Sequence, residues 1–200
     1  MKRMMWMLGL MVVLNGCVSA DYFEQIQRSA HDVDAIKASD SEQEMKIRDL
    51  EKRVNELQSS LRPVIDQQGV TVDGASAGEV RVTLPQSVLF ASGSVEINEQ
   101  GRKVLADVAQ VALKGGDKPI RVVGHSDALP LSGELKKHFT DNWELSAARA
   151  ASVARVLIWG EGVTQDRIRV EGRGSAEPVG DNTSKQGRNQ NRRIEIFIAG

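Results

Sequence analysis

The sequence predicts an α+β domain in which two helices pack on one face of a mixed β-sheet, preceded by a long helical stalk. Two observations predict this organisation. Beyond residue 79, four short segments alternate apolar and polar residues and two longer ones repeat apolar residues at helical spacing, in the order βαβαββ. Residues 22–61 contain neither glycine nor proline and carry a seven-residue apolar pattern.

Residues 1–16 have the pattern of a signal peptide. Lys2 and Arg3 precede an apolar run over residues 4–14, which is too short to span a bilayer. The run leads into the sequence Leu-Asn-Gly-Cys, which ends at Cys17 and resembles the lipobox of bacterial lipoproteins. The alternative is an ordinary secretory signal with an incidental cysteine.

The lipobox resemblance implies that Cys17 is acylated and becomes the N-terminus of the mature chain, with residues 17–21 as the lipidated segment. Cys17 is the only cysteine, so the chain forms no intramolecular disulfide. Val18 and Ser19 stand where an aspartate would signal retention at the inner membrane. The resemblance therefore implies a lipid anchor in the cell outer membrane, with the protein facing the periplasm.

Residues 22–62 are expected to form the helical stalk. The seam of its heptad pattern is apolar at every position within residues 47–61, whereas polar residues such as Asp40 interrupt the earlier part. Two interpretations stay open: a coiled coil that joins chains into a homo-oligomer through residues 22–61, or a single solvated helix. At about 1.5 Å per residue, either form reaches roughly 60 Å from the membrane.

Pro63 is expected to end the stalk helix. Three glycines follow closely, so residues 63–78 are predicted to be a turn-rich hinge, with the folded domain over residues 79–200. The expected elements are strands at residues 80–84, 120–124, 168–170 and 194–198 and helices at residues 99–113 and from 141 to about 160. Asp141, with Glu144 three residues later, predicts a capping box at the start of the second helix.

The charge distribution excludes a nucleic-acid partner. The chain has 26 basic and 27 acidic residues and a formal net charge of −1. The basic residues are interspersed with acidic ones, whereas nucleic-acid binding requires a basic surface that neutralises phosphates.

An arginine on the second helix is the most informative single residue. Leu145, Ala148, Ser152, Val156 and Trp159 share one stripe at helical spacing, and Arg149 lies on its edge. A charge that points toward a core needs a partner. Asp127, just after the strand at residues 120–124, is the candidate. The pair is either a buried structural salt bridge or two walls of a cleft that a zwitterionic ligand completes.

Three motifs carry a resemblance to a known family. Gly-His-Ser-Asp at residues 124–127, Asn-Trp-Glu-Leu-Ser-Ala-Ala-Arg-Ala at residues 142–150 and Asn-Arg-Arg-Ile-Glu at residues 191–195 resemble the OmpA-like peptidoglycan-binding domain. The second motif is most similar to its version in MotB flagellar stator proteins. The resemblance covers about residues 79–199. It implies the fold named above and a partner, the peptidoglycan of the cell wall.

The resemblance also implies the site. Asp127 and Arg149 match the residues that clasp the free amino-acid end of diaminopimelate in the stem peptide, and Phe90 matches an aromatic residue that lines the pocket. Further matching positions around the pocket are Ser126, Asn142, Leu145 and Ser146. Arg192 and Arg193 match an arginine pair in which one member is structural and one is near the ligand; the pattern does not say which, and Arg193 is included in the predicted site.

An enzyme would need a catalytic constellation that the sequence does not show. His125 beside Asp127 could act as a general base, and His31 and His138 could bind a metal, but the three histidines lack ligand spacing and no nucleophile motif is present. We therefore expect no catalysis, no metal and no cofactor.

The functional prediction is a non-catalytic lipoprotein that tethers the outer membrane, or an envelope complex, to the cell wall. The alternative is an accessory structural lipoprotein of a flagellar motor or another envelope machine, with its specific role in the stalk. An ion-conducting stator subunit is excluded because the apolar run at residues 4–14 is short and contains no acidic residue.

Overall fold

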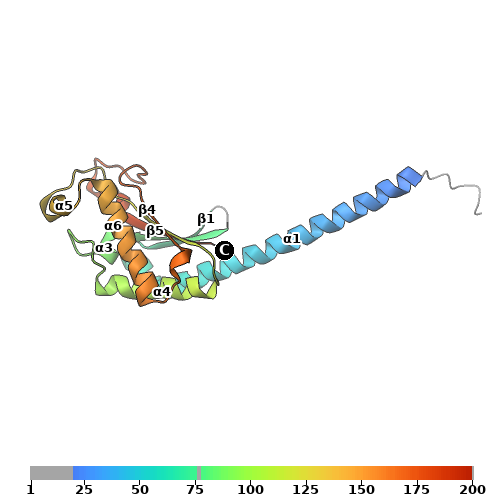
Figure 1. Ribbon diagram of the computed structural model, residues 1–200, viewed down its shortest axis with the longest axis horizontal. Coiled ribbons are helices and arrows are strands. Elements are labelled where there is room, and N and C mark those ends of the chain that lie inside the picture. The colour runs from blue at the N-terminus through green and yellow to red at the C-terminus, as the bar shows by residue number, and fades with distance from the viewer. Residues whose placement is uncertain (1–19, 76–77, 200) are drawn as a thin grey trace, which may run out of the picture. The chain divides into compact units, whose positions relative to one another are not determined.

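The computed structural model of the chain describes residues 20–75 and 78–199. The predicted signal peptide and Cys17 lie outside the described residues. The chain divides into two compact units, Met1–Met45 and Lys46–Gly200. Helix α1 (Ala20–Ser60) is continuous across this boundary (Figure 1). Within the described ranges, no helix has both the length and the apolar composition that crossing a membrane requires.

Five strands form one mixed sheet in the order β1-β2-β5-β3-β4. Their bounds are Thr71–Ala75 for β1, Glu79–Pro85 for β2, Ile120–Gly124 for β3, Ile168–Gly172 for β4 and Arg193–Ala199 for β5. Strands β3 and β4 are parallel, and the other neighbouring pairs are antiparallel. Because β2 and β3 both run antiparallel to β5, their carboxyl ends meet the amino end of β5 at one edge of the sheet.

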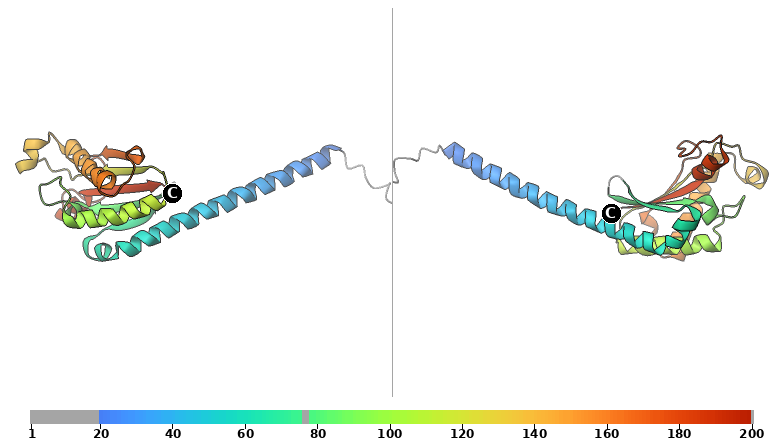
Figure 2. Two further views of the ribbon diagram at one scale, coloured as in Figure 1. Left: turned by 60° about the horizontal axis from the view of Figure 1, so that its bottom comes forward. Right: turned by 180° about the vertical axis from the view of Figure 1, so that it is seen from behind.

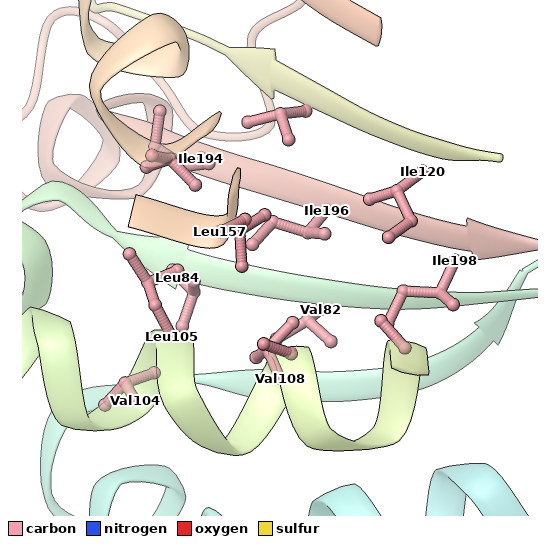
Figure 3. Packing of buried hydrophobic residues seen from close by; sticks show 14 of the residues in the cluster. Val82, Leu84, Val104, Leu105, Val108, Ile120, Leu157, Ile194, Ile196 and Ile198 are labelled. Atoms are coloured by element: carbon pink, nitrogen blue, oxygen red, sulfur yellow. The ribbon is translucent and has the colours of Figure 1, made fainter. Parts of the chain in front are cut away.

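Two helices pack on one face of this sheet, as the alternating patterns predict (Figure 2). They are α4 (Glu99–Lys114) and α6 (Asn142–Arg155), and α6 continues through a π-helical turn at Val156–Gly160. Figure 3 shows inward side chains of the strands meeting those of α4 and of the π-helical turn. The labelled side chains are Val82, Leu84, Val104, Leu105, Val108, Ile120, Leu157, Ile194, Ile196 and Ile198. The α+β order of the six expected elements is confirmed.

Short helices fill the connections. They are α2 (Arg62–Gln68), α3 (Gln86–Leu89), α5 (Gly133–His138), a 3₁₀ turn at Gln165–Arg167, and α7 (Lys185–Asn191). Helices α4 and α6 cover one face of the sheet, and the side chains of β2 alternate between this face and the opposite one. Val80, Val82 and Leu84 are buried, while Arg81 and Thr83 between them are partly exposed on the opposite face.

Two glycines let α6 lie close to the sheet. A Cβ on Gly124, the last residue of β3, would stand 2.1 Å from the carbonyl oxygen of Ser146. A Cβ on Gly172, at the end of β4, would stand 2.7 Å from the backbone of Ala147. No side chain fits at either place. The first turns of α6 are therefore pressed against the carboxyl ends of β3 and β4.

The segment at residues 63–78 differs from the predicted hinge. It contains α2 and the edge strand β1, whose Val72 is opposite Val82 of β2. Leu61, Val70 and Val72 are buried in the core. The long helix ends at Ser60, three residues before Pro63, and α2 begins at Arg62 with Pro63 in its first turn. The folded unit extends upstream of residue 79.

The apolar seam packs on the chain's own domain from Leu50 to Leu61, whereas Ile47 is 55% exposed. Leu57 is fully buried, and Leu50 and Val54 pack against the core. The side chain of Arg53, 8% exposed, donates to the carbonyl oxygen of Ala199 at 2.9 Å. This part of the seam therefore does not present the continuous free surface that a coiled coil over residues 22–61 would use.

Candidate functional site

The candidate site lies where the carboxyl ends of β2 and β3 meet the amino end of β5. Asp127 is three residues beyond β3, Gln86 directly follows β2, and Arg192 directly precedes β5. The backbone N–H of Gln86 donates to the carbonyl oxygen of Arg192 at 2.9 Å, which fixes these two segments side by side. Helix α6 brings Arg149 to the same edge.

Asp141 caps the amino end of α6. Its Oδ1 accepts hydrogen bonds from the backbone N–H of Trp143 at 2.9 Å and of Glu144 at 3.0 Å. Glu144 Oε2 accepts from the N–H of Thr140 at 2.5 Å, one residue before the position that a standard capping box would use. The predicted start of the helix is confirmed, but Glu144 bonds to the N–H of Thr140 rather than to that of Asp141.

Asn142 ties the helix to the loop that carries Asp127. Its Nδ2 donates to the carbonyl oxygens of Asp127 at 3.1 Å and Leu129 at 2.8 Å. Ser126 is buried, and its hydroxyl donates to the carbonyl oxygen of Asp127 at 3.0 Å. These side chains shape the backbone around the acid.

Ser146 and Leu145 support the site from within α6. The hydroxyl of Ser146 donates to the carbonyl oxygen of Trp143 and accepts from the N–H of Gly174, both at 3.0 Å. Leu145 is buried. Both residues hold the first turn of α6 against the sheet.

The carboxylate of Asp127 is 10% exposed and bonded on both oxygens. Its Oδ1 accepts from the N–H of Leu129 at 3.1 Å, and its Oδ2 forms an ion pair with Nη1 of Arg192. The side chain of Arg192 is 31% exposed and also donates to Asn189 Oδ1, so a partly exposed arginine lies between this acid and solvent.

Arg149 is buried, with 3% of its surface exposed. Its Nη1 donates to Gln86 Oε1 at 2.7 Å, and its Nε and Nη2 both donate to the carbonyl oxygen of Ser94 at 3.3 Å. The ring centroid of Phe90 lies 5.5 Å from its Cζ. A guanidinium has five N–H groups. One hydrogen on each Nη is therefore left for a further acceptor.

The pKa of Arg149 is lowered to about 10, first by burial and then by the charge of Arg192, while Asp127 acts in the opposite direction. The group still carries its charge at neutral pH. Its side chain therefore offers a desolvated cation beside a nearly buried carboxylate, an arrangement suited to a small ligand with both charges.

Asp127 and Arg149 do not form a salt bridge with each other. Among the ion pairs of the described residues, Asp127 is joined to Arg192, while Arg149 is held by the neutral oxygens of Gln86 and Ser94. The structural alternative of a direct buried bridge is therefore not what the structure shows. Two opposite charges lie near each other, each bonded to another group.

The two consecutive arginines have different surroundings. Arg193 is 5% exposed, and its Nε donates to Glu195 Oε1 at 2.8 Å while its Nη2 donates to the carbonyl oxygen of Glu177 at 3.2 Å. Arg192, not Arg193, reaches Asp127. The sequence prediction placed Arg193 at the ligand, whereas the structure engages its guanidinium with Glu195 and the backbone.

The phase of α6 differs from the predicted stripe. Trp159 is 73% exposed, and Ser152 and Val156 are only partly buried. The buried stripe instead contains Leu145, Arg149, Ala150, Val153 and Leu157. The hydrogen bonds that Arg149 donates to Gln86 and Ser94 offset part of the cost of turning this arginine inward.

His125 contacts Glu195 rather than a catalytic partner. It is 2% exposed, and its Nε2 lies 3.6 Å from Glu195 Oε2, too far for a hydrogen bond. Burial by itself raises the pKa of Glu195, but His125 and Arg193 outweigh it and hold that pKa at about 2. His138 is exposed on α5, and within the described part of the chain no group of side chains is arranged to hold a metal.

An open cleft of about 1080 Å³ adjoins the site. It is lined by residues on the face of the sheet opposite α4 and α6, together with residues of α7. Gln86, Phe90 and Arg192 line the cleft and also contact Arg149 or Asp127. Gln86 and Ser94 were not among the predicted site residues, although Gln86 lies two positions after the strand predicted at residues 80–84.

The sequence matches the OmpA family over residues 89–192. It is 33% identical over 142 residues to the probable lipoprotein YiaD of Escherichia coli, a match that covers 71% of this chain and 61% of the relative. It also matches Motility protein B of Bacillus subtilis, with 27% identity over 58% of this chain and 44% of that protein. The chain thus spans about half the length of the curated relatives that it matches.

Solved structures show the same domain. A putative MotB-like protein from Desulfovibrio vulgaris matches with a TM-score of 0.67 and 29% identity, covering 78% of this chain and 94% of that one. The cell wall anchor of the T6SS from Pseudomonas aeruginosa matches with a TM-score of 0.63 and 35% identity, covering 72% and 96%. Such domains are structural peptidoglycan-binding modules rather than enzymes. The chain belongs to the OmpA family.

Proposed function

We propose that this protein binds peptidoglycan by clasping the amino-acid end of diaminopimelate between Asp127 and Arg149. One observation carries the proposal: two opposite charges lie at one sheet edge, neither paired with the other. Asp127 is bonded to a half-exposed arginine and Arg149 to a neutral amide, so a ligand's ammonium and carboxylate can replace or share both partners.

The ligand chemistry follows from the two charges. Diaminopimelate carries an ammonium and a carboxylate on one carbon at the end of its side chain. The ammonium would contact Asp127, and the carboxylate would accept the remaining Nη hydrogens of Arg149. A lysine at the same place in the stem has no such carboxylate and would leave Arg149 with these hydrogens unused. A buried site discriminates strongly against a ligand that leaves one of the site's polar groups without a hydrogen-bond partner.

The relatives support a role at the wall. One solved relative is titled a cell wall anchor, and another relative is named a probable lipoprotein. With them in view, we propose that Cys17 is lipidated, that the mature protein lies in the outer membrane facing the periplasm, and that α1 spaces the wall-binding domain from the lipid. The protein would then tether the membrane to the wall.

A second function has support from α1. Ile36 and Ile47, two seam positions, are 60% and 55% exposed, and Met45 is 62% exposed. Exposed apolar residues on a helix suit contact with another helix. An accessory role in an envelope machine, or a homo-oligomer, would use this part of α1 while the domain holds the wall.

Co-sedimentation with purified sacculi tests the wall-binding proposal. The full chain in detergent should sediment with diaminopimelate-type sacculi, and free meso-diaminopimelate should release it. A lysine whose α-amino and α-carboxyl groups are both blocked as amides, as they are in a stem peptide, should not release it at the same concentration. Equal sedimentation with lysine-type sacculi, or release by the blocked lysine, would contradict a clasp that reads both charges.

A further inference from the structure

The cleft beside the clasp is rich in groups that bind peptides. Its lining includes the amide side chains Gln68, Gln86, Gln186, Asn189 and Gln190 and the arginines Arg81, Arg192 and Arg193. Glu195, which also lines the cleft, is engaged by Arg193. Carboxamides can both donate to and accept from peptide bonds. Once Arg193 and Glu195 are set aside as a pair, the charged side chains left in the lining are the positive Arg81 and Arg192.

Arg81 has donors that the protein does not fully use. It lies in the middle of β2, on the face opposite α4 and α6, and its Nε is buried without a hydrogen-bond partner. Its nearest acid is Asp73 on β1, whose Oδ2 is 3.8 Å from Nη2, with both side chains about half exposed. A contact of this length and exposure is weak. A buried unsatisfied donor calls for an explanation, and a ligand acceptor supplies one.

The cleft and the clasp share their walls. Gln86 binds Arg149 and Arg192 binds Asp127, and both of these side chains line the cleft. Neither Asp127 nor Arg149 lines it. A ligand that displaces Gln86 or Arg192 from the clasp therefore extends from the clasp into the cleft.

The length of the cleft along β2 fits a short peptide. Arg81 precedes Gln86 by five positions, which corresponds to about 16 Å at roughly 3.3 Å per residue of strand. The long side chains of Arg81 and of diaminopimelate each cover part of this distance, so the residue that precedes diaminopimelate in an extended peptide covers the remainder. Free diaminopimelate, held at the clasp, does not reach Arg81.

We infer that this cleft is a second subsite, which binds the carboxylate-bearing peptide next to diaminopimelate, with Arg81 pairing with a peptide carboxylate. The inference rests on the proposed function and adds the part of the ligand that the clasp does not hold. A neutral sugar chain would leave the arginine without a counter-charge, whereas an acidic peptide satisfies both its charge and its donors. The amide side chains bind the peptide bonds.

Titration of the full chain in detergent tests the subsite. The probes are free meso-diaminopimelate, a synthetic stem peptide in which a glutamate with a free carboxylate precedes diaminopimelate, and the same peptide with that carboxylate amidated. Arg81→Gln should weaken binding of the acidic peptide about tenfold and leave binding of free diaminopimelate and of the amidated peptide unchanged. The thermal unfolding of the variant should match that of the unsubstituted protein.

Arg121→Gln is the matched control. Arg121 of β3 lies directly opposite Phe197 of β5, on the same face of the sheet as Arg81. Its guanidinium stacks on the Phe197 ring, 4.0 Å from the centroid, and pairs with Glu79. It does not line the cleft. This variant should bind all three probes normally.

The outcomes separate the two proposals. If the unsubstituted protein fails to bind free diaminopimelate, the proposed clasp is wrong. If it binds free diaminopimelate but Arg81→Gln binds the acidic peptide unchanged, only the second subsite is wrong. Equal weakening of all three probes by Arg81→Gln would also overturn the subsite, since it would show an indirect effect on the clasp.

Discussion

Arg192 forms an ion pair with Asp127 where the start of β5 lies beside the start of the loop that follows β3. The pair joins two residues 65 positions apart in the sequence. Its consequence is that Arg149, the other charge at this edge, is held by Gln86 and the backbone of Ser94 rather than by the acid. In the proposed function, a zwitterionic ligand replaces or shares these partners.

Removal of either clasp charge should reduce wall binding. Asp127→Asn and Arg149→Gln each delete one charge-assisted contact, so sedimentation with diaminopimelate-type sacculi should weaken about 10- to 100-fold. Arg155→Gln, an exposed arginine on the same helix, should bind normally. Undiminished sedimentation by both clasp variants, with native circular dichroism, would refute the site.

Gly124→Ala should destabilise the domain. The new methyl group would stand 2.1 Å from the carbonyl oxygen of Ser146, so α6 has to move away from the sheet. Overpacking of this kind costs about 3 kcal/mol or more. Gly160→Ala is the control, because its Cβ would meet only an ordinary contact at 3.7 Å. Similar urea midpoints for the two variants would show that the close approach is not required.

Stability should fall in acid through Glu195. Its folded pKa is held at about 2, below the unfolded value of 4.5, so the ionised form stabilises the fold. This contribution, about 2–3 kcal/mol, is complete above pH 5 and is lost as the pH falls from about 5 to 2. Glu195→Gln should be less stable than the unsubstituted protein at pH 7 and should show a flatter stability profile across that acid range. Parallel profiles for the two proteins would contradict the assignment.

The folded unit should require the end of α1. Leu57 is fully buried, so Leu57→Ala should lower the free energy of unfolding by about 2–5 kcal/mol. Ile47→Ala, at a position 55% exposed, should change it by no more than about 0.5 kcal/mol. A fragment that begins at residue 46 should unfold cooperatively, whereas one that begins at residue 79 should not; cooperative unfolding of the shorter fragment would show that α2 and β1 are dispensable.

Cys17→Ser should detach the protein from membranes without changing its binding to sacculi, because the lipid and the clasp are separate parts of the chain. Flotation with lipid vesicles measures the first property and sedimentation with sacculi the second. Persistent flotation of the variant would contradict lipidation at Cys17.

The order of strands and helices could be predicted because their patterns are local. Alternation in β2 and β3 and the apolar spacing of α4 have periods of 2 and 3.6 residues, which neighbouring positions already display. Asp141 marks the start of α6 for the same reason, since a cap bonds to the N–H groups two and three residues ahead.

The use of the heptad seam could not be predicted from its pattern. An apolar stripe indicates that its residues will be buried but does not indicate which surface will cover them. The prediction allowed a second copy of the helix as the cover, whereas Leu57 and Leu61 pack into the core of their own domain. The glycines at residues 63–78 had likewise suggested a hinge, but β1 gains its hydrogen bonds from β2 and becomes an edge strand.

The sequence alone determined the main strands and helices, the family motifs and the choice of Asp127 and Arg149 as the candidate charges, because residue type and short spacing are properties of the chain itself. Only the tertiary structure decided that Arg192 pairs with Asp127, that Gln86 and Ser94 hold Arg149, and that Arg193 is engaged by Glu195. The physical reason is that each of these contacts depends on which strand ends share an edge of the sheet. That arrangement is set by packing of the whole domain rather than by any local pattern.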